Sequence, residues 1–165
     1  MTSSWVLLPL LALSPGQLRH DDVVNSADYA PCGLNSFYLV CRLLDAPVEW
    51  QRAKELLGDA GPDGMHSFQD IARAGEAVRL YPVGLKTEVA RLADLPVPAI
   101  VHVRDPRRAN NPPHLLVLLR CDPESVILLD PPMPAYSLPV EDFAKVWTGH
   151  ILVFARDQPS AWRLR

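Results

Sequence analysis

The stretch NSADYAPCGLNSFYLVCRLL, residues 25–44, joins a polar segment that contains a proline to an apolar segment. The change takes place at Cys32 and Gly33. The apolar residues that follow recur every three or four positions, which predicts a helix with one buried face. They are Leu34, Phe37, Cys41 and Leu44. The sequence therefore places a cysteine where a helix begins, and the role of that cysteine is the first question the chain raises.

The elements after this helix predict an α+β domain. Two more helices are expected, at residues 48–58 with Gly58 at the end, and at residues 66–78 with Ser67 as the cap and Asp70 in the capping-box position. Two shorter helical stretches are expected at residues 86–92 and 140–147. Five strands are expected, at residues 78–83, 98–104, 114–120, 125–130 and 150–156. Helices followed by an antiparallel sheet are typical of the α+β class.

Composition narrows the class of protein. The 165 residues are enough for one domain, and the formal net charge of -3, with scattered basic residues, does not indicate nucleic-acid binding. The cysteines are Cys32, Cys41 and Cys121, separated by 9 and 80 residues, which fits no zinc motif and no disulfide framework. One reactive cysteine and two buried apolar ones fit better. No cofactor is indicated.

The N-terminal segment has two interpretations. The run WVLLPLLAL, residues 5–13, is too short to span a bilayer and resembles the apolar part of a signal peptide, although no basic residue precedes it. It is either a signal or anchor, or an arm packed on the domain. We expect residues 1–20 to form this segment, 21–158 the domain and 159–165 a tail. The expected location is cytoplasmic or membrane-associated, with export left open.

The position of Cys32 favours a reactive thiol. A helix begins with unpaired N–H groups and the positive end of its dipole, and both favour thiolate over thiol. The same N–H groups can hold a developing oxyanion. The competing interpretation is a buried or capping cysteine without a chemical role. The decision depends on whether the fold brings a base to Cys32.

His114 is the best candidate for that base. It opens an apolar strand directly after a polar loop, and Asp130 follows the next apolar strand. If the two strands pair through the turn between them, both side chains lie at one rim of the sheet, where the carboxylate can orient the imidazole. The alternatives are a strand-edge histidine and an aspartate that starts a turn. A metal site formed by Cys32, His114 and Asp130 has the least support, because the spacing is not that of a metal motif.

The other four histidines are assigned less reactive positions. We expect His102 to pack in a buried strand and His66 to support the Ser67 cap. His150 is expected at the surface and His20 outside the core.

With these residues identified, five stretches in the same order resemble the bacteriocin-processing, double-glycine leader peptidases. They are APCGLNSFYLVCRLL (30–44), HSFQDIARAGEAVRLYPVGLK (66–86), LADLPVPAIVHV (92–103), HLLVLLRCDPESVILLDPP (114–132) and LPVEDFAKVWTGHILVF (138–154). The resemblance implies a papain-like cysteine peptidase fold with N-terminal helices packed on a C-terminal antiparallel sheet. It also implies Cys32 as nucleophile, His114 as base, Asp130 as the orienting residue, and cleavage after Gly-Gly in a peptide precursor.

Two departures from the family pattern leave a second function open. The family has a glutamine about six residues before the cysteine, which donates to the oxyanion; here that position is Ser26, next to Asn25, and either residue could donate instead. The chain also has no phosphate-binding loop and no series of membrane helices, so an exporter would be a separate chain. The alternative to an endopeptidase is a peptide-binding domain of the same fold with little or no turnover; related thiol acyl transfer is a third reading.

Overall fold

In the computed structural model of this protein, the described residues are 31–46, 48–62, 64–104, 113–131, 133–155 and 157. Three helices come first: α2 (Cys32–Leu43), α3 (Trp50–Leu57) and α4 (Phe68–Ala77). Six strands follow, with a 3₁₀ helix η1 (Val89–Asp94) and a short helix α5 (Val140–Ala144) between them. The strands are β1 (Tyr81–Lys86), β2 (Ala99–Arg104), β3 (Pro113–Cys121), β4 (Ser125–Leu129), β5 (Tyr136–Pro139) and β6 (Trp147–Ala155). The predicted α+β class is confirmed.

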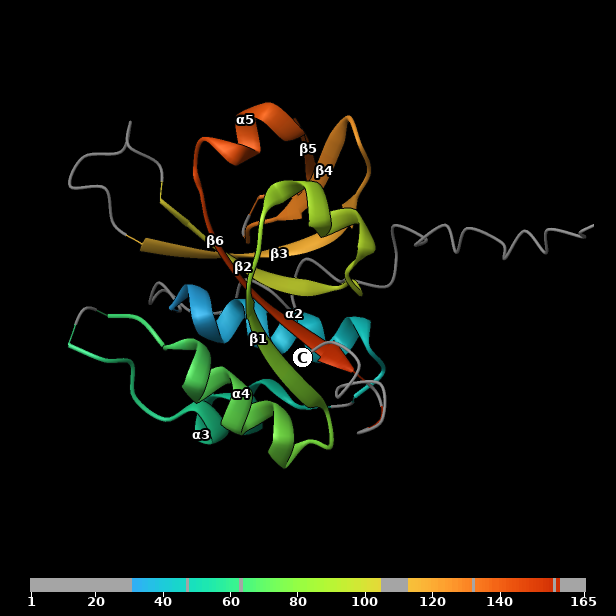
Figure 1. The fold of residues 1–165 in the computed structure, drawn as a ribbon. Helices are drawn as coiled ribbons and strands as arrows, with labels where there is room; N and C mark the ends of the chain where they lie inside the picture. Colours follow the sequence, from blue (N-terminus) through green and yellow to red (C-terminus); the bar gives the residue numbers. More distant parts are fainter. Residues whose placement is uncertain are drawn as a thin grey trace, which may run out of the picture.

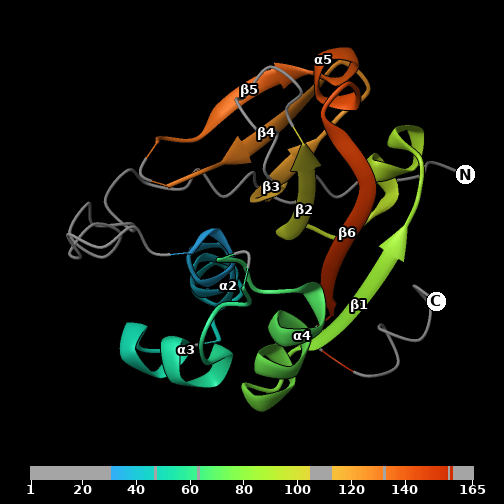
Figure 2. The same cartoon turned by 90° about the vertical axis from the view of Figure 1, so that its left-hand side faces the viewer.

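The six strands form one sheet in the order β1-β6-β2-β3-β4-β5, and all neighbouring pairs are antiparallel. Figure 1 shows the three helices on one side of this sheet, and Figure 2 shows α5 at the opposite end of the molecule from α3 and α4. Side chains alternate between the two faces along each strand. Ile100 and Leu152 therefore join the core beneath the helices, whereas Val101 and Ile151 join a second core on the other face.

Helix α2 is the centre of the first core. The sequence predicted one buried face, but eight of its twelve residues are buried, including Leu39 and Val40 on other faces of the helix. The cause is that α2 contacts strand β3 and also α3 and α4, so it lies between the sheet and the other helices (Figure 2). A helix that is apolar all round is typical of such a buried position.

Helix α4 begins where its capping residues predict. The Ser67 Oγ accepts a hydrogen bond from the Asp70 N–H at 3.1 Å, and the Asp70 carboxylate accepts one from the Ser67 N–H at 3.0 Å. Helix α3 ends at Gly58, whose φ of 70° lies in the left-handed region that glycine adopts without strain. Both boundaries agree with the sequence analysis.

Other boundaries differ from the prediction. The first strand begins at Tyr81 rather than at residue 78, because Leu80 and Val78 belong to the core beneath the helices. Strand β6 begins at Trp147 and α5 ends at Ala144, so the predicted helix over 140–147 was too long. The stretch predicted as a helix at 86–92 is the 3₁₀ helix η1, three residues later. Strand β5 was not predicted.

Candidate active site

Cys32 is the first residue of α2 and is half-buried. The carbonyl of Pro31, the residue before the helix, accepts hydrogen bonds from the N–H groups of Leu34 and Asn35 at 2.9 and 3.2 Å. The N–H groups of Cys32 and Gly33 come before these two, at the end of the helix that has no intrahelical partners. The thiol is therefore placed at the positive end of α2, as the sequence predicted.

Gly33 is required by a close contact. A Cβ atom at this position would lie 2.8 Å from the Cβ atom of His66 and 3.2 Å from its Nδ1 atom. His66 itself is 3 % exposed, and its Nε2 atom donates to the Gly58 carbonyl at 3.1 Å. The prediction that His66 only supports the Ser67 cap was therefore incomplete, because its ring packs against the residue that follows Cys32.

Ser36 fixes the first turn of α2 to the sheet. It lies one turn after Cys32, is 1 % exposed, and its hydroxyl donates to the Leu115 carbonyl at 3.4 Å. Leu115 is the neighbour of His114 in strand β3. This contact joins the elements that carry Cys32 and His114. A small polar residue within an apolar helix is the signal in the sequence from which this contact could have been predicted.

His114 and Asp130 meet at one end of the sheet. Strands β3 and β4 are antiparallel, with Val117 opposite Leu129, so Asp130 lies within two residues of the position opposite His114. The His114 Nε2 atom and the Asp130 Oδ1 atom are 2.8 Å apart, and both side chains are mostly buried. The strand pairing expected from the sequence therefore brings the two side chains together. Their catalytic roles stay a prediction.

The surroundings of His114 stabilise its protonated form. Its pKa is raised to about 9, first by the hydrogen bond with Asp130 and then by a hydrogen bond with Cys32, which outweigh the effect of burial. With Nε2 on Asp130, the nitrogen left for the thiol is Nδ1. The structure thus connects Cys32, His114 and Asp130 in one hydrogen-bonded series, and at neutral pH it favours an imidazolium between a sulfur and a carboxylate.

The remaining predicted residues fall in three groups. The two oxyanion candidates, Asn25 and Ser26, lie outside the described residues, as do His20 and the N-terminal segment. Cys41 is completely buried, as expected, and burial raises its pKa to about 12. Cys121 is half-buried at the end of β3, which differs from the prediction of a buried residue.

His102 and His150 lie close to each other. Both ring Nδ1 atoms contact the Thr148 hydroxyl, at 2.8 and 3.2 Å, so His102 is a half-buried polar group and not a packing residue. His150 is exposed, as predicted, but it lies within β6 and does not begin it.

Two observations concern the described part of the chain as a whole. Within these residues, no three histidine, cysteine, aspartate or glutamate side chains form a group that fits a metal ion. The same residues include no helix with the length and apolar character needed to cross a bilayer.

Several solved structures share this fold. One is a double glycine motif protease from an AMS/PCAT transporter in complex with the leader peptide, with 22% identity over 80% of this chain and 89% of that chain, and a TM-score of 0.67. Another is the peptidase domain of Streptococcus ComA, described as a bi-functional ABC transporter, with 21% identity over 82% of this chain and 98% of that chain, and a TM-score of 0.67.

A third is the N-terminal peptidase C39 like domain of a toxin secretion ATP-binding protein from Vibrio parahaemolyticus. It is 20% identical over 79% of this chain and all of that chain, with a TM-score of 0.61. These likenesses confirm the papain-like α+β fold expected from the sequence. Among curated proteins, no match to the chain is found.

The family model is matched over most of the chain. Residues 21–159 match the model of the Peptidase C39 family, a range that includes all the described elements and the three residues of the hydrogen-bonded series. The family resemblance expected from the sequence is thereby confirmed, and the chain is a peptidase domain by descent. This protein belongs to the peptidase C39 family.

Proposed function

We propose that this protein is a thiol-dependent endopeptidase in which Cys32 is the nucleophile, His114 the general base and acid, and Asp130 the residue that orients the imidazole. The observation that carries the proposal is the His114–Asp130 pair, 2.8 Å apart, whose imidazole also interacts with Cys32, the first residue of α2. A pair of nucleophile and base, oriented by a third group, is the arrangement that nucleophilic catalysis requires.

The first half of the reaction forms an acyl-enzyme. The Cys32 sulfur attacks the carbonyl carbon of the scissile peptide bond, and the carbonyl oxygen becomes an oxyanion close to the Cys32 N–H. His114, protonated beforehand, gives its proton to the leaving nitrogen as the C–N bond breaks. The products of this half-reaction are a free amine and a thioester on Cys32.

The second half releases the acyl group. His114, now neutral, takes a proton from water, and the hydroxide oxygen attacks the thioester carbon. The C–S bond breaks, the product leaves as a carboxylic acid that gives its proton to solvent, and Cys32 returns as a thiolate beside the imidazolium. Asp130 keeps its hydrogen bond to Nε2 throughout, which directs Nδ1 at the reacting atoms.

The proposed substrate is a peptide precursor that is cleaved after Gly-Gly. The support comes from the family and from the protein of the same fold that is described as a double glycine motif protease bound to its leader peptide. The proposed partner is a membrane exporter, since a structure of the same fold is the peptidase domain of an ABC transporter. Such a partner places the proposed activity at the cytoplasmic side of a membrane.

The second candidate is a peptide-binding domain of the same fold with little turnover. The observation that favours it is the serine at position 26, where the family has glutamine. Loss of one oxyanion donor costs about 10²–10³ in rate in other enzymes. In the endopeptidase proposal, Asn25 or Ser26 supplies the missing donor together with the Cys32 N–H.

The two candidates are separated by incubating the purified chain with a synthetic leader peptide that contains Gly-Gly and following products by mass spectrometry. The endopeptidase predicts a single cut after the second glycine, absent in Cys32→Ala. Binding of the peptide by the wild-type chain with no cut, under conditions where Cys32 is reduced, would support the binding domain instead. Replacing Ser26 by glutamine is the sharpening variant, because a restored donor should raise the cleavage rate.

A further inference from the structure

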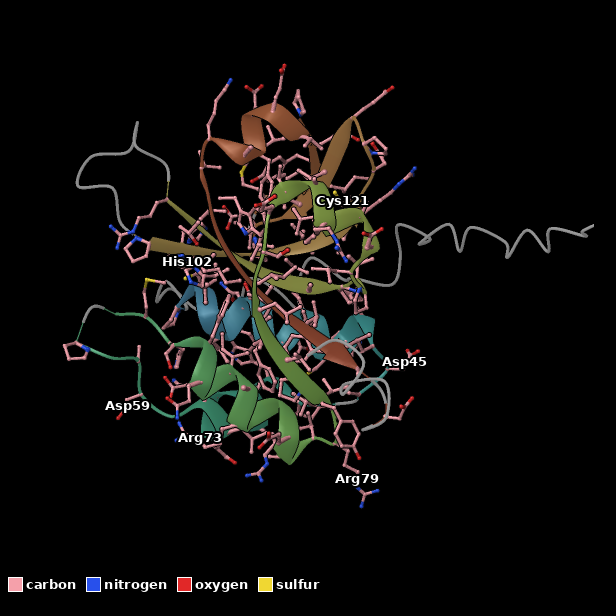
Figure 3. All side chains as sticks on the ribbon, in the orientation of Figure 1. Asp45, Asp59, Arg73, Arg79, His102 and Cys121 are labelled. Carbon is pink, nitrogen blue, oxygen red and sulfur yellow. The ribbon has the colours of Figure 1, made fainter. Side chains whose placement is uncertain are left out.

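A cavity of about 510 Å³ lies between the start of α4 and strands β2, β3 and β6. Its wall includes three of the four histidines that the proposed mechanism does not use, His66, His102 and His150, together with Phe68, Asp70 and Arg104. Figure 3 labels His102 between the sheet and the first turns of α2, whereas Cys121 is labelled away from it. The cavity is therefore at the end of the sheet where α2 begins.

The cavity adjoins the proposed catalytic residues. His66, in its wall, packs against Gly33, the residue after Cys32. Pro113 and Leu115, also in its wall, are the two neighbours of His114 in β3. A peptide whose scissile bond lies at Cys32 can therefore place a nearby side chain in this cavity.

The hydrogen bonds of Thr148 determine which atoms the histidines offer. The single hydroxyl proton of Thr148 is donated to the His102 carbonyl at 2.9 Å. The hydroxyl oxygen must then accept from the Nδ1 atoms of both His102 and His150. In a neutral imidazole, the nitrogen without a proton is an acceptor. Both rings, when neutral, therefore keep Nε2 as a hydrogen-bond acceptor.

His66 follows the same logic on the opposite wall. Its Nε2 atom donates to the Gly58 carbonyl, which leaves Nδ1 as an acceptor. This Nδ1 atom is buried and has no hydrogen-bond partner within the part of the chain that the structure describes. Because this atom has almost no accessible surface and faces Gly33, it is closed off from the cavity. The ring acceptors available to a ligand are therefore those of His102 and His150.

Charge restricts the kind of donor. Burial and the neighbouring His150 and Arg104 lower the pKa of His102, so its ring is neutral at physiological pH. Arg104 adds a guanidinium to the wall, and the Asp70 carboxylate is already engaged by Ser67 and Arg73. A carboxylate ligand has no proton for neutral imidazoles, and an ammonium ligand would meet Arg104 without a free carboxylate to balance it.

We propose that this cavity is a substrate subsite that receives a carboxamide side chain, glutamine or asparagine, close to the scissile bond. The two N–H bonds of the amide would be donated to the Nε2 atoms of His102 and His150, and its carbonyl would accept from Arg104. The inference rests on the proposed peptidase function and names a feature of its substrate. Hydrogen bonds of this kind discriminate because an apolar side chain would leave the acceptors unpaired.

The test measures peptide binding to Cys32→Ala, so that turnover does not enter. Labelled peptides keep Gly-Gly before the bond and carry one glutamine, in turn, at each of the four positions that precede Gly-Gly and the four that follow the bond, and matched sets carry leucine or glutamate there. At pH 7.5 we expect one position at which glutamine lowers the dissociation constant by about tenfold relative to both, the size of one or two neutral hydrogen bonds. Peptides that bind equally well with glutamine, leucine and glutamate at every position would overturn the proposal.

The variants His102→Phe and His150→Phe, each on Cys32→Ala, keep the ring size and remove the acceptors. In each variant, glutamine should lower the dissociation constant by less than about threefold relative to leucine and glutamate. Arg91→Gln, an exposed substitution on η1 outside the cavity, is the control that should keep it. If His102→Phe does not fold, the exposed position of His150 still provides the test. A preference that survives in a folded histidine variant contradicts the proposal.

A readout that does not need a peptidase separates this inference from the proposed function. The Cε1 protons of His102 and His150, assigned by these variants, are followed by NMR during titration with N-acetyl-glutamine methylamide and with the leucine analogue. Shifts from the glutamine probe alone support the subsite even if no Gly-Gly peptide binds. Equal shifts, or none, from the two probes would overturn it.

Discussion

Cys32 and Cys41 lie on the same helix, nine residues and about 13.5 Å apart along its axis, and the structure treats them differently. Cys41 is completely buried among apolar side chains, and its raised pKa of about 12 keeps it as a thiol. Cys32 is at the start of the helix, partly accessible and hydrogen-bonded to His114. The same side chain is thus a small apolar filler at one place and a candidate nucleophile at the other.

The difference shows that reactivity comes from the surroundings. A helix start supplies unpaired N–H groups, and the sheet supplies an imidazole and a carboxylate. The middle of α2 offers neither, because Phe37 and Val40 fill the neighbouring positions and are completely buried. The substitutions below first remove the sulfur atoms and then the groups that surround the Cys32 sulfur.

The largest expected effect on the cleavage rate comes from removing the Cys32 sulfur, and removal of the Cys41 sulfur is its matched control. Cys32→Ala should lower the rate of Gly-Gly peptide cleavage at least about 10⁴-fold, because no other group can form the acyl-enzyme. Cys41→Ala should leave the rate within about threefold and lower the free energy of unfolding by about 1 kcal/mol, from the small cavity. Peptide cleavage and urea unfolding measure both. Equal losses of activity in the two variants would show that Cys32 acts only through the structure.

Removing the base should make Cys32 resemble an ordinary cysteine. We expect His114→Ala to retain the fold and to lower the alkylation rate of Cys32 at pH 6 by about 10²-fold, since the thiolate loses its cationic partner. Iodoacetamide labelling followed by peptide mapping gives the rate for each cysteine. Arg91→Gln, an exposed substitution on η1 outside the catalytic residues and the cavity, is the control. An unchanged Cys32 rate in His114→Ala would exclude His114 from the mechanism.

Asp130→Asn should act through His114. Loss of the carboxylate lowers the pKa of His114 from about 9, and the alkylation rate of Cys32 at pH 6 should fall by about tenfold. The raised pKa contributes stability that is fully present below pH 6.5 and is lost as the pH rises through 9. The difference in free energy of unfolding between the wild-type chain and Asp130→Asn should therefore shrink as the pH rises from 6.5 to about 9. An NMR titration of His114 with the same midpoint in both proteins would contradict the assignment.

The smallest effect is expected from Gly33→Ala. The added methyl group would meet His66 at 2.8 Å, so the ring or the first turn of α2 must move. We expect the free energy of unfolding to fall by about 1–3 kcal/mol, with a reduced Cys32 alkylation rate. Gly84→Ala is a matched control, because nothing lies within 4 Å of its added methyl group. Equal stability of the two variants would mean that the contact with His66 is unimportant.

Sequence reasoning succeeded where local chemistry decides the structure. The start of α4 follows from Ser67 and Asp70, which pair with each other over three residues. The approach of His114 to Asp130 follows from two apolar strands joined by a short turn, a pairing with little choice of partner. The position of Cys32 follows from a polar segment that gives way to an apolar one.

The features that were not predicted depend on contacts between residues that are distant in the sequence. The contact of His66 with Gly33 joins residues 33 positions apart, and the Ser36 bond to Leu115 joins residues 79 apart. Neither spacing is visible as a period in the sequence. Strand β5 has only four residues, and the last of them is Pro139. Its pairing with β4, and not its composition, makes it a strand.

The start of strand β1 was also set by tertiary contacts. Val78 and Leu80 continue the apolar pattern of a strand, yet they pack beneath the helices, and Arg79 between them has a positive φ of 64°. The chain therefore turns before it pairs with β6. The roles of Asn25 and Ser26 stay predictions, because both lie outside the described residues.

The measurement that tests the central claim most directly is the alkylation rate of Cys32 from pH 5 to 9, in the wild-type chain and in His114→Ala, with a cysteine-containing unfolded peptide as the reference thiol. The account predicts that Cys32 in the wild-type chain reacts at pH 6 at least about tenfold faster than the reference, and that this advantage disappears in His114→Ala. A wild-type rate that equals the reference at pH 6, or an advantage that survives without the imidazole, would contradict it.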